Sequence, residues 1–213
     1  MKNLIIVGAS GFGRELLQWV KDINSKEPTW TIKGFLDDNL DALEGYECDV
    51  KVIGTIKDWQ PAEDEVFAIA IASPLIKEMV VRSLESRGAE FVSVIHPSAS
   101  IGSFNKVGKA IVMYPNSRII VNATVGDYVT ILDNTSVGHD TKVGNFTTVC
   151  GNGSINGHVT LGNNVFFGTH VSAIPGVTIG DRSYVSAGSV VMSDIPEDAR
   201  VFGIPARKMP GNK

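Results

Sequence analysis

Cysteine and long apolar runs are both scarce in this sequence, and each shortage excludes a class of protein. Cys48 and Cys150 are its two cysteines, too few for a disulfide framework and too far apart for a CxxC metal pair. The longest apolar runs, at 4–7 and 66–72, are far shorter than the roughly 20 apolar residues that cross a bilayer. We therefore expect a protein without a disulfide scaffold and without membrane insertion.

Clustered positive charge is also lacking. The 213 residues include 19 Lys or Arg and 23 Asp or Glu, and no run of basic residues stands out. Nucleic-acid binding needs such a cluster, so we expect no nucleic acid among the partners. At the N-terminus, Lys2 precedes a short apolar run that ends at Gly8, which favours a first β-strand over a signal peptide. The expected location is cytoplasmic.

A repeat of six residues dominates the second half of the chain. Seventeen consecutive positions, every sixth residue from Ile95 to Val191, are apolar without a break. The next residue is often glycine, and the residue four places on is small or β-branched. This period fits neither an α-helix nor a flat strand, and it is typical of a parallel β-helix, in which each hexad forms a short strand and a corner. Three hexads then form one coil of about 18 residues, with room for about five coils.

Charge is sparse along these repeats. Residues 95–191 contain 9 charged side chains, against 33 in the remainder of the chain. A surface this poor in charge is usually covered by association with another molecule, so we expect the protein to associate with itself.

The first half follows a different pattern, in which strands alternate with helices. The expected elements are a strand at 2–7, a helix at 14–23, strands at 31–36 and 66–72, a helix at 74–87 behind an N-cap at Ser73, and a strand at 91–95. This alternation predicts a small parallel α/β sheet. No linker is visible, so we divide the chain into a Rossmann-like domain, residues 1–95, and a β-helix domain with a C-terminal tail, residues 96–213.

Glycines 8, 11 and 13 lie between the first strand and the first helix. Backbone N–H groups of such a loop can bind phosphate, and Asp37, after the second strand, is placed to bind a ribose hydroxyl. About 95 residues are too few for both halves of a dinucleotide fold, so the pattern favours one nucleotide, such as that of a nucleotide-diphosphate sugar, over NAD. A tight turn without any ligand remains the alternative.

His139 and Asp140 occupy a corner of the expected β-helix, outside its core. The predicted coil places Asp140 beneath His158, and an imidazole beside a carboxylate can act as a general base. An exposed corner histidine without a function is the alternative. A catalytic zinc on His139, His158 and His170 is not expected, because these residues occupy different positions in their hexads. We interpret Cys150 as a packing residue rather than a nucleophile.

Four segments spread over the whole chain form a specific combination, although none is specific alone. They are VGASGFG at 7–13, FLDDN at 35–39, LDNTSVGHD at 132–140 and VFGIPAR at 201–207. Together they resemble the NeuD/PglD-type sugar acetyltransferases. The resemblance implies a homotrimer of left-handed β-helices whose active sites lie in grooves between subunits. It also implies acetyl-CoA as the acetyl donor and no metal.

The same resemblance implies roles for individual residues. His139 would be the general base, and Asp140 the acid that orients it. The backbone N–H of Gly157 would contact the thioester carbonyl and stabilise the oxyanion. Asn134, just before the histidine in the matched segment, is expected to contact the substrate.

Binding residues form two further sets. Those expected along the CoA groove are Thr169, Ala187, Arg207 and Lys208. Those expected around the nucleotide-linked sugar are Gly8, Ser10, Gly11, Gly13, Asp37 and Asp38. Two positions depart from the family: Phe12 stands where some members have a histidine, and Thr148 stands where some have a second histidine near the first. We consider His158 a partial replacement for the latter.

The implied function is acetyl transfer to the amine of a UDP-, dTDP- or GDP-linked 4-amino sugar, for surface-glycan biosynthesis. O-acetylation of sialic acid or another sugar hydroxyl is a first alternative, because the shape of the pocket decides the acceptor. A non-catalytic partner of a glycan-biosynthesis enzyme is a second alternative, against which the intact His139–Asp140 pair argues.

Overall fold

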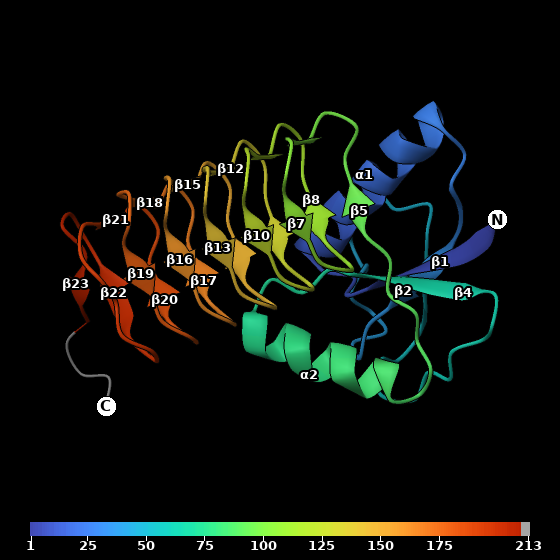
Figure 1. Cartoon of the computed structure of the whole chain (residues 1–213). Helices are drawn as coiled ribbons and strands as arrows, with labels where there is room; N and C mark the ends of the chain where they lie inside the picture. Colours follow the sequence, from blue (N-terminus) through green and yellow to red (C-terminus); the bar gives the residue numbers. More distant parts are fainter. Residues whose placement is uncertain (210–213) are drawn as a thin grey trace.

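The computed structural model describes residues 1–209, which form an α/β part followed by a β-helix (Figure 1). The α/β part contains a parallel sheet with the strand order β3-β2-β1-β4. Its elements are β1 (Lys2–Val7), α1 (Gly11–Lys26), β2 (Trp30–Leu36), β3 (Val52–Gly54), β4 (Glu65–Ile69) and α2 (Pro74–Glu85). Residues 4–7 of β1 are fully buried, as a central parallel strand requires when both faces of its sheet are covered.

Most of the predicted elements of this part are confirmed. The strands predicted at 2–7, 31–36 and 66–72 correspond to β1, β2 and β4, and both helices are present. Their ends differ from the prediction by a few residues, and α1 begins at Gly11, inside the glycine loop. Apolar patterning therefore located the elements, while their ends depend on backbone hydrogen bonds that the pattern does not contain.

Two features differ from the prediction. Strand β3 was not predicted, because so short a strand shows no periodicity. Of the strand predicted at 91–95, only β5 (Val94–Ile95) is a regular strand, and it pairs with the β-helix and not with the α/β sheet, to which Phe91 forms a single bridge at Phe67. The domain boundary predicted between residues 95 and 96 falls directly after β5 and stays a prediction.

The β-helix is a three-sided prism of very short strands. The five-stranded face contains β7 (Lys106–Val107), β10 (Thr124–Val125), β13 (Lys142–Val143), β16 (Thr160–Leu161) and β19 (Thr178–Ile179). The six-stranded face contains β6 (Ser100–Ile101), β9 (Arg118–Ile119), β12 (Ser136–Val137), β15 (Ser154–Ile155), β18 (Ser172–Ala173) and β21 (Val190–Val191). The eight-stranded face contains β5, β8 (Val112–Met113), β11 (Thr130–Ile131), β14 (Thr148–Val149), β17 (Phe166–Phe167), β20 (Tyr184–Val185), β22 (Arg200–Phe202) and β23 (Arg207–Lys208).

The strand pairing confirms the predicted coil of three hexads. Val137 lies beside Ile155, and Ile155 beside Ala173, always in parallel register. Every sixth residue from Met113 to Val191 is buried inside the prism, whereas Ile101, in the first coil, is 41% exposed. The predicted fold class, an α/β domain followed by a left-handed parallel β-helix of hexapeptide repeats, is confirmed.

The corners of the prism have one repeated backbone conformation. Between Phe104 and Asp198, a series of residues other than glycine has φ between 52 and 62°, at intervals that mostly equal one hexad. Asn, Asp and His tolerate this left-handed region better than most side chains. A corner is therefore a position where a histidine or an aspartate can stand exposed at low conformational cost.

Helix α2 connects the two parts by packing on the eight-stranded face (Figure 1). Lys77 of α2 is fully buried there, and its Nζ donates hydrogen bonds to the hydroxyl oxygens of Thr130 and Thr148 at 3.1 and 3.0 Å. Tyr114 adds a second contact, because its hydroxyl donates to the carbonyl oxygen of Phe12 at 3.3 Å. The two parts thus share one hydrophobic cluster.

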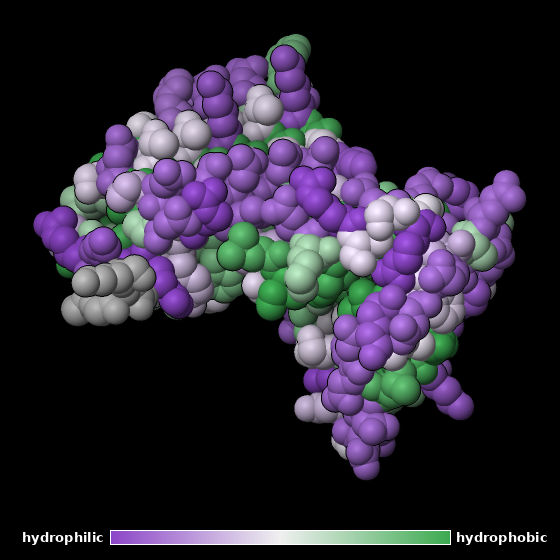
Figure 2. Space-filling view, turned by 90° about the horizontal axis from the view of Figure 1, so that it is seen from below, coloured by the Kyte–Doolittle hydropathy of each residue, from purple (hydrophilic) through white to green (hydrophobic). Residues whose placement is uncertain are grey.

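The opposite side of α2 is left uncovered. Leu75, Ile76 and Met79 are 55%, 50% and 64% exposed. Figure 2 shows apolar surface gathered in the notch between the β-helix and the α/β part. No helix within residues 1–209 has both the length and the apolar character needed to cross a membrane.

Candidate active site

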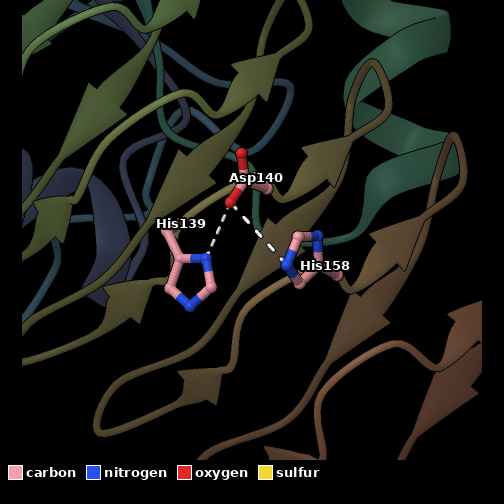
Figure 3. A group of neighbouring side chains, drawn as sticks. All are labelled: His139, Asp140 and His158. Carbon is pink, nitrogen blue, oxygen red and sulfur yellow. Dashed lines mark hydrogen bonds and ion pairs between the residues drawn. The ribbon is translucent and has the colours of Figure 1, made fainter.

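Two consecutive coils bring His139, Asp140 and His158 together, as the coil period predicts (Figure 3). These residues lie where the six-stranded face turns into the five-stranded face, and we call this edge the histidine corner. His139 Nδ1 is 2.8 Å from Asp140 Oδ2, and His158 Nε2 is 3.8 Å from the same oxygen. The two rings are perpendicular, with their centroids 5.1 Å apart. All three side chains are exposed.

The contact with Asp140 determines which nitrogen of His139 is available. The carboxylate accepts a hydrogen bond from Nδ1, so Nδ1 carries the proton of the neutral ring. Nε2 then has a free lone pair, and among residues 1–209 it has no hydrogen-bond partner. A neutral imidazole with an exposed Nε2 and a carboxylate behind it is suited to accept a proton.

Gly157 lies directly against the His139 ring. A Cβ built on Gly157 would come within 2.4 Å of both Nε2 and Cε1 of His139, which no real side chain could do. The N–H of Gly157 makes no backbone hydrogen bond within the described chain. The histidine corner therefore places a proton acceptor next to a free backbone donor.

The other predicted residues of the β-helix lie on a different edge. Asn134, Thr169 and Ala187 stand where the eight-stranded face turns into the six-stranded face, together with Asn152 and His170, and we call this edge the asparagine corner. Within one chain the structure does not bring them to His139. It also separates His170 from the other two histidines, so the set of three histidine ligands does not form. Asn134 Nδ2 donates to Asp133 Oδ2 at 3.2 Å.

Two residues of the C-terminal tail were also predicted to bind CoA. Arg207 and Lys208 form β23, which pairs antiparallel with β22, and both are exposed. Cys150, in contrast, is buried in the asparagine corner. Burial raises the pKa of the Cys150 thiol to about 11, so the thiol stays protonated and is a poor nucleophile near neutral pH.

The glycine loop combines tightly packed and open positions. Gly8 has φ of 104°, and a Cβ on Gly13 would lie 2.0 Å from the carbonyl oxygen of Gly8, so both positions require glycine. Gly11 and Ser10 are exposed, and Ser10 precedes α1 without a side-chain capping bond. These two residues form the open rim of the loop.

The two acidic residues after β2 are bound by the backbone. The Asp37 carboxylate accepts hydrogen bonds from the N–H groups of Ala9 and Asn39, at 2.8 and 2.9 Å. Asp38 Oδ1 accepts one from the N–H of Lys57 at 3.2 Å. Asp37 therefore fixes the glycine loop to the end of β2, a role that the sequence did not indicate.

A cavity of about 680 Å³ beside α1 was also missed. Arg14, Lys21, Tyr46 and Cys48 are among its lining residues. The Arg14 guanidinium lies 3.6 Å from the centre of the Tyr46 ring. Tyr46 belongs to the long connection between β2 and β3, which carries no motif after Asn39, so the sequence offered no signal for this contact.

The comparisons with known proteins agree with the fold. Residues 3–84 match the PglD N-terminal domain, and residues 158–192 match the bacterial transferase hexapeptide repeats. Over 44 residues the chain is 52% identical to a galactoside O-acetyltransferase of Escherichia coli; the match covers 21% of this chain and 22% of that protein. The chain thus spans about a fifth of the length of the curated relatives it matches.

Solved structures resemble the whole chain. The acetyltransferase domain of PglB from Neisseria gonorrhoeae superimposes with a TM-score of 0.88 at 22% identity, over 98% of this chain and 100% of that one. PerB from Caulobacter crescentus, solved with CoA and GDP-perosamine, gives 0.87 at 23% identity, over 98% of each chain.

Fold and sequence thus define a two-part hexapeptide-repeat protein with a histidine–aspartate pair on one edge of its β-helix. With a PglD N-terminal domain ahead of transferase hexapeptide repeats, the resemblance to the NeuD/PglD-type sugar acetyltransferases is confirmed in domain composition and in fold.

Proposed function

We propose that the protein is an acetyl-CoA-dependent acetyltransferase that acts on the amine of a nucleotide-linked 4-amino sugar. The observation that carries this proposal is the exposed His139–Asp140 pair beside the free N–H of Gly157. The presence of CoA and GDP-perosamine in the PerB structure supports the same reaction class. The product would serve the synthesis of surface glycans.

The proposed reaction assigns one role to each of these groups. The amine nitrogen attacks the thioester carbonyl carbon while Nε2 of His139 removes one proton from the nitrogen. The Gly157 N–H donates to the oxyanion that forms, and Asp140 stabilises the imidazolium through Nδ1. The C–S bond then breaks, and the CoA thiolate leaves with the proton that His139 releases. The products are the amide and CoA thiol, with His139 again neutral.

The division of the predicted site between two corners supports a homotrimer. Thr169 and Ala187, proposed to line the CoA groove, are on the asparagine corner, whereas His139 is on the histidine corner. If the asparagine corner of one subunit packs beside the histidine corner of the next, each groove receives both sets of residues. The low charge of the repeats and the exposed apolar side chains of α2 also favour association.

The nucleotide would bind at the glycine loop. Ser10 and Gly11 offer an open rim in front of the N-terminus of α1, where phosphate is favoured. Gly8 and Gly13 allow the tight turn, and Asp37 holds its backbone in place. The contact between Phe12 and Tyr114, with ring centroids 5.5 Å apart, connects this loop to the β-helix.

O-acetylation of sialic acid or another sugar hydroxyl is the second candidate. The short match to a galactoside O-acetyltransferase favours it, and the same histidine could deprotonate a hydroxyl. A non-catalytic partner role is a third possibility, and isothermal titration that detects no acetyl-CoA binding would favour it.

A thiol-release assay tests the reaction class. Purified protein and acetyl-CoA would be offered UDP-, dTDP- and GDP-linked 4-amino sugars, with free and CMP-linked sialic acid in parallel. We expect CoA release with one of the amino sugars. Release with sialic acid alone would assign O-acetylation instead.

Mixing two variants tests the shared groove. His139→Asn disables the histidine corner, and Thr169→Arg blocks the asparagine corner. Each homotrimer should be inactive, but a mixed trimer contains one interface with two intact corners and should recover part of the activity. Mixed trimers that remain inactive would place the site within one chain.

A further inference from the structure

Three side chains with metal-binding atoms meet at the histidine corner. His139, Asp140 and His158 each offer one nitrogen or oxygen, and these atoms all lie within 4.8 Å of one another. Zinc bonds to nitrogen and oxygen of about 2.0–2.2 Å in a tetrahedral site place neighbouring donor atoms about 3.4 Å apart. The observed spacings from Asp140 Oδ2, 2.8 Å to His139 and 3.8 Å to His158, lie on either side of this value.

The backbone fixes the positions from which these side chains extend. Asp140 and His158 both have the left-handed corner conformation, with φ of 59° and 62°. The N–H of His158 donates to the carbonyl oxygen of His139 at 3.0 Å, which fixes the two coils in register. Both rings face the Asp140 carboxylate from this fixed backbone (Figure 3), so the three donors already converge on one region.

We propose that His139, Asp140 and His158 form a binding site for Zn²⁺ or a similar transition-metal cation. Two imidazoles and one carboxylate suit such ions and leave a fourth position for water. On binding, the ion takes the place of the proton on His139 Nδ1, and this proton moves through solvent to Nε2, so the ring stays neutral and no oxidation or reduction takes place. With the ion on Nδ1 and the proton on Nε2, His139 could no longer accept a proton, so the bound ion would inhibit acetyl transfer. This inhibition rests on the proposed function, whereas the metal binding does not.

Isothermal titration of the tag-free, EDTA-treated full chain with ZnCl₂ tests the site. We expect one ion per chain. His158→Asn removes one ligand and should weaken binding roughly tenfold or more. Asparagine suits this position because Asn122 and Asn152 adopt the same corner conformation, with φ of 54° and 57°. His170→Asn, the matched control on the asparagine corner, should bind zinc like the wild type.

Two results of this titration would overturn the proposal. One is the absence of stoichiometric binding to the wild type. The other is equal affinity in the wild type and in His158→Asn. Substitution of Co²⁺ for Zn²⁺ gives an independent readout, because a cobalt ion with these ligands absorbs visible light and the His158→Asn variant should lose that band.

The thiol-release assay separates binding from inhibition. Zn²⁺ should inhibit the wild type, EDTA should restore the rate, and His158→Asn should need more Zn²⁺ for the same inhibition. Binding without inhibition would contradict the occupation of His139. If no acceptor supports thiol release, the titration still decides the metal site, so failure of the proposed function and failure of the site are distinguishable.

Discussion

The ring of His139 lies against the α-carbon of Gly157, so closely that a Cβ at 157 would come within 2.4 Å of Nε2. The backbone of Gly157 is not in the left-handed region, so the requirement for glycine comes from the ring and not from φ. The position of the proposed base thus depends on residue 157, one coil away, having no side chain.

Gly157→Ala should therefore impair catalysis more than folding. The added methyl group must displace the His139 ring, and a displacement of about 1 Å can reduce the rate roughly 10²-fold. The measurement is kcat by thiol release, with the thermal midpoint as a check on folding. In a His139→Ala background the methyl group meets no ring, so Gly157→Ala should add no further loss there. An equal loss in both backgrounds would contradict this explanation.

His139→Asn should lower kcat by roughly 10²–10⁴, the usual contribution of a general base. The KM for acetyl-CoA should change little, because His139 is proposed to act on the amine rather than to hold CoA. Steady-state kinetics at saturating acceptor would measure both constants. Full kcat in this variant would exclude the general-base role.

Lys77→Met should stabilise the protein near neutral pH. Burial lowers the pKa of Lys77 to about 7 from the ordinary 10.5, so between these values the unfolded chain holds a proton that the folded chain has lost. Stability must then rise with pH across this interval, and the destabilising effect of the buried amine is largest at its acidic end. Methionine has a similar shape and does not titrate.

Urea unfolding of Lys77→Met and the wild type at pH 7 and pH 10, at one protein concentration, measures this effect. The variant should be more stable at pH 7, and the difference should shrink by pH 10. Lys26→Met, at an exposed position at the end of α1, is the control and should follow the wild type. A difference that grows with pH would show that Lys77 is charged in the folded protein.

Asp37→Ala should destabilise the glycine loop. It leaves the N–H of Ala9, a fully buried residue, without its acceptor, and an unsatisfied buried donor costs about 1–3 kcal/mol. The N–H of Asn39 is exposed, so water can replace the acceptor that it loses. Asp38→Ala loses one exposed hydrogen bond and should cost much less. Urea unfolding compares the two variants, and equal losses would contradict the role assigned to Asp37.

The sequence predicted the β-helix well because its signal is periodic. One apolar residue in each hexad fixes the inward direction, and a coil of three hexads then places His158 above Asp140, as the structure confirms. Sheet order and the β3 strand were not predictable, since they depend on pairing between distant segments that no local pattern records. The structural role of Asp37 was missed for the same reason.

The division of the predicted site between two corners is contained in the sequence only as a spacing between residues, and no motif marks it. The separation of His139 and Thr169 along the chain is not a whole number of coils, so the two belong to different edges. The burial of Lys77 had no signal either, because a lysine on a helix ordinarily faces solvent. It is buried because α2 packs on the β-helix, a tertiary contact.

Because every coil contains three hexads, the β-helix can change its length without rearranging its edges only by whole coils. Insertion of one whole coil would extend the prism by about 4.8 Å and leave each edge with its own residues. Insertion of a single hexad between His139 and Thr169 would move every residue after it by one face and place Thr169 on the edge that holds His139. Evolution or design can thus lengthen the groove only by whole coils. An insertion of one or two hexads would instead change which residues face each other across the groove.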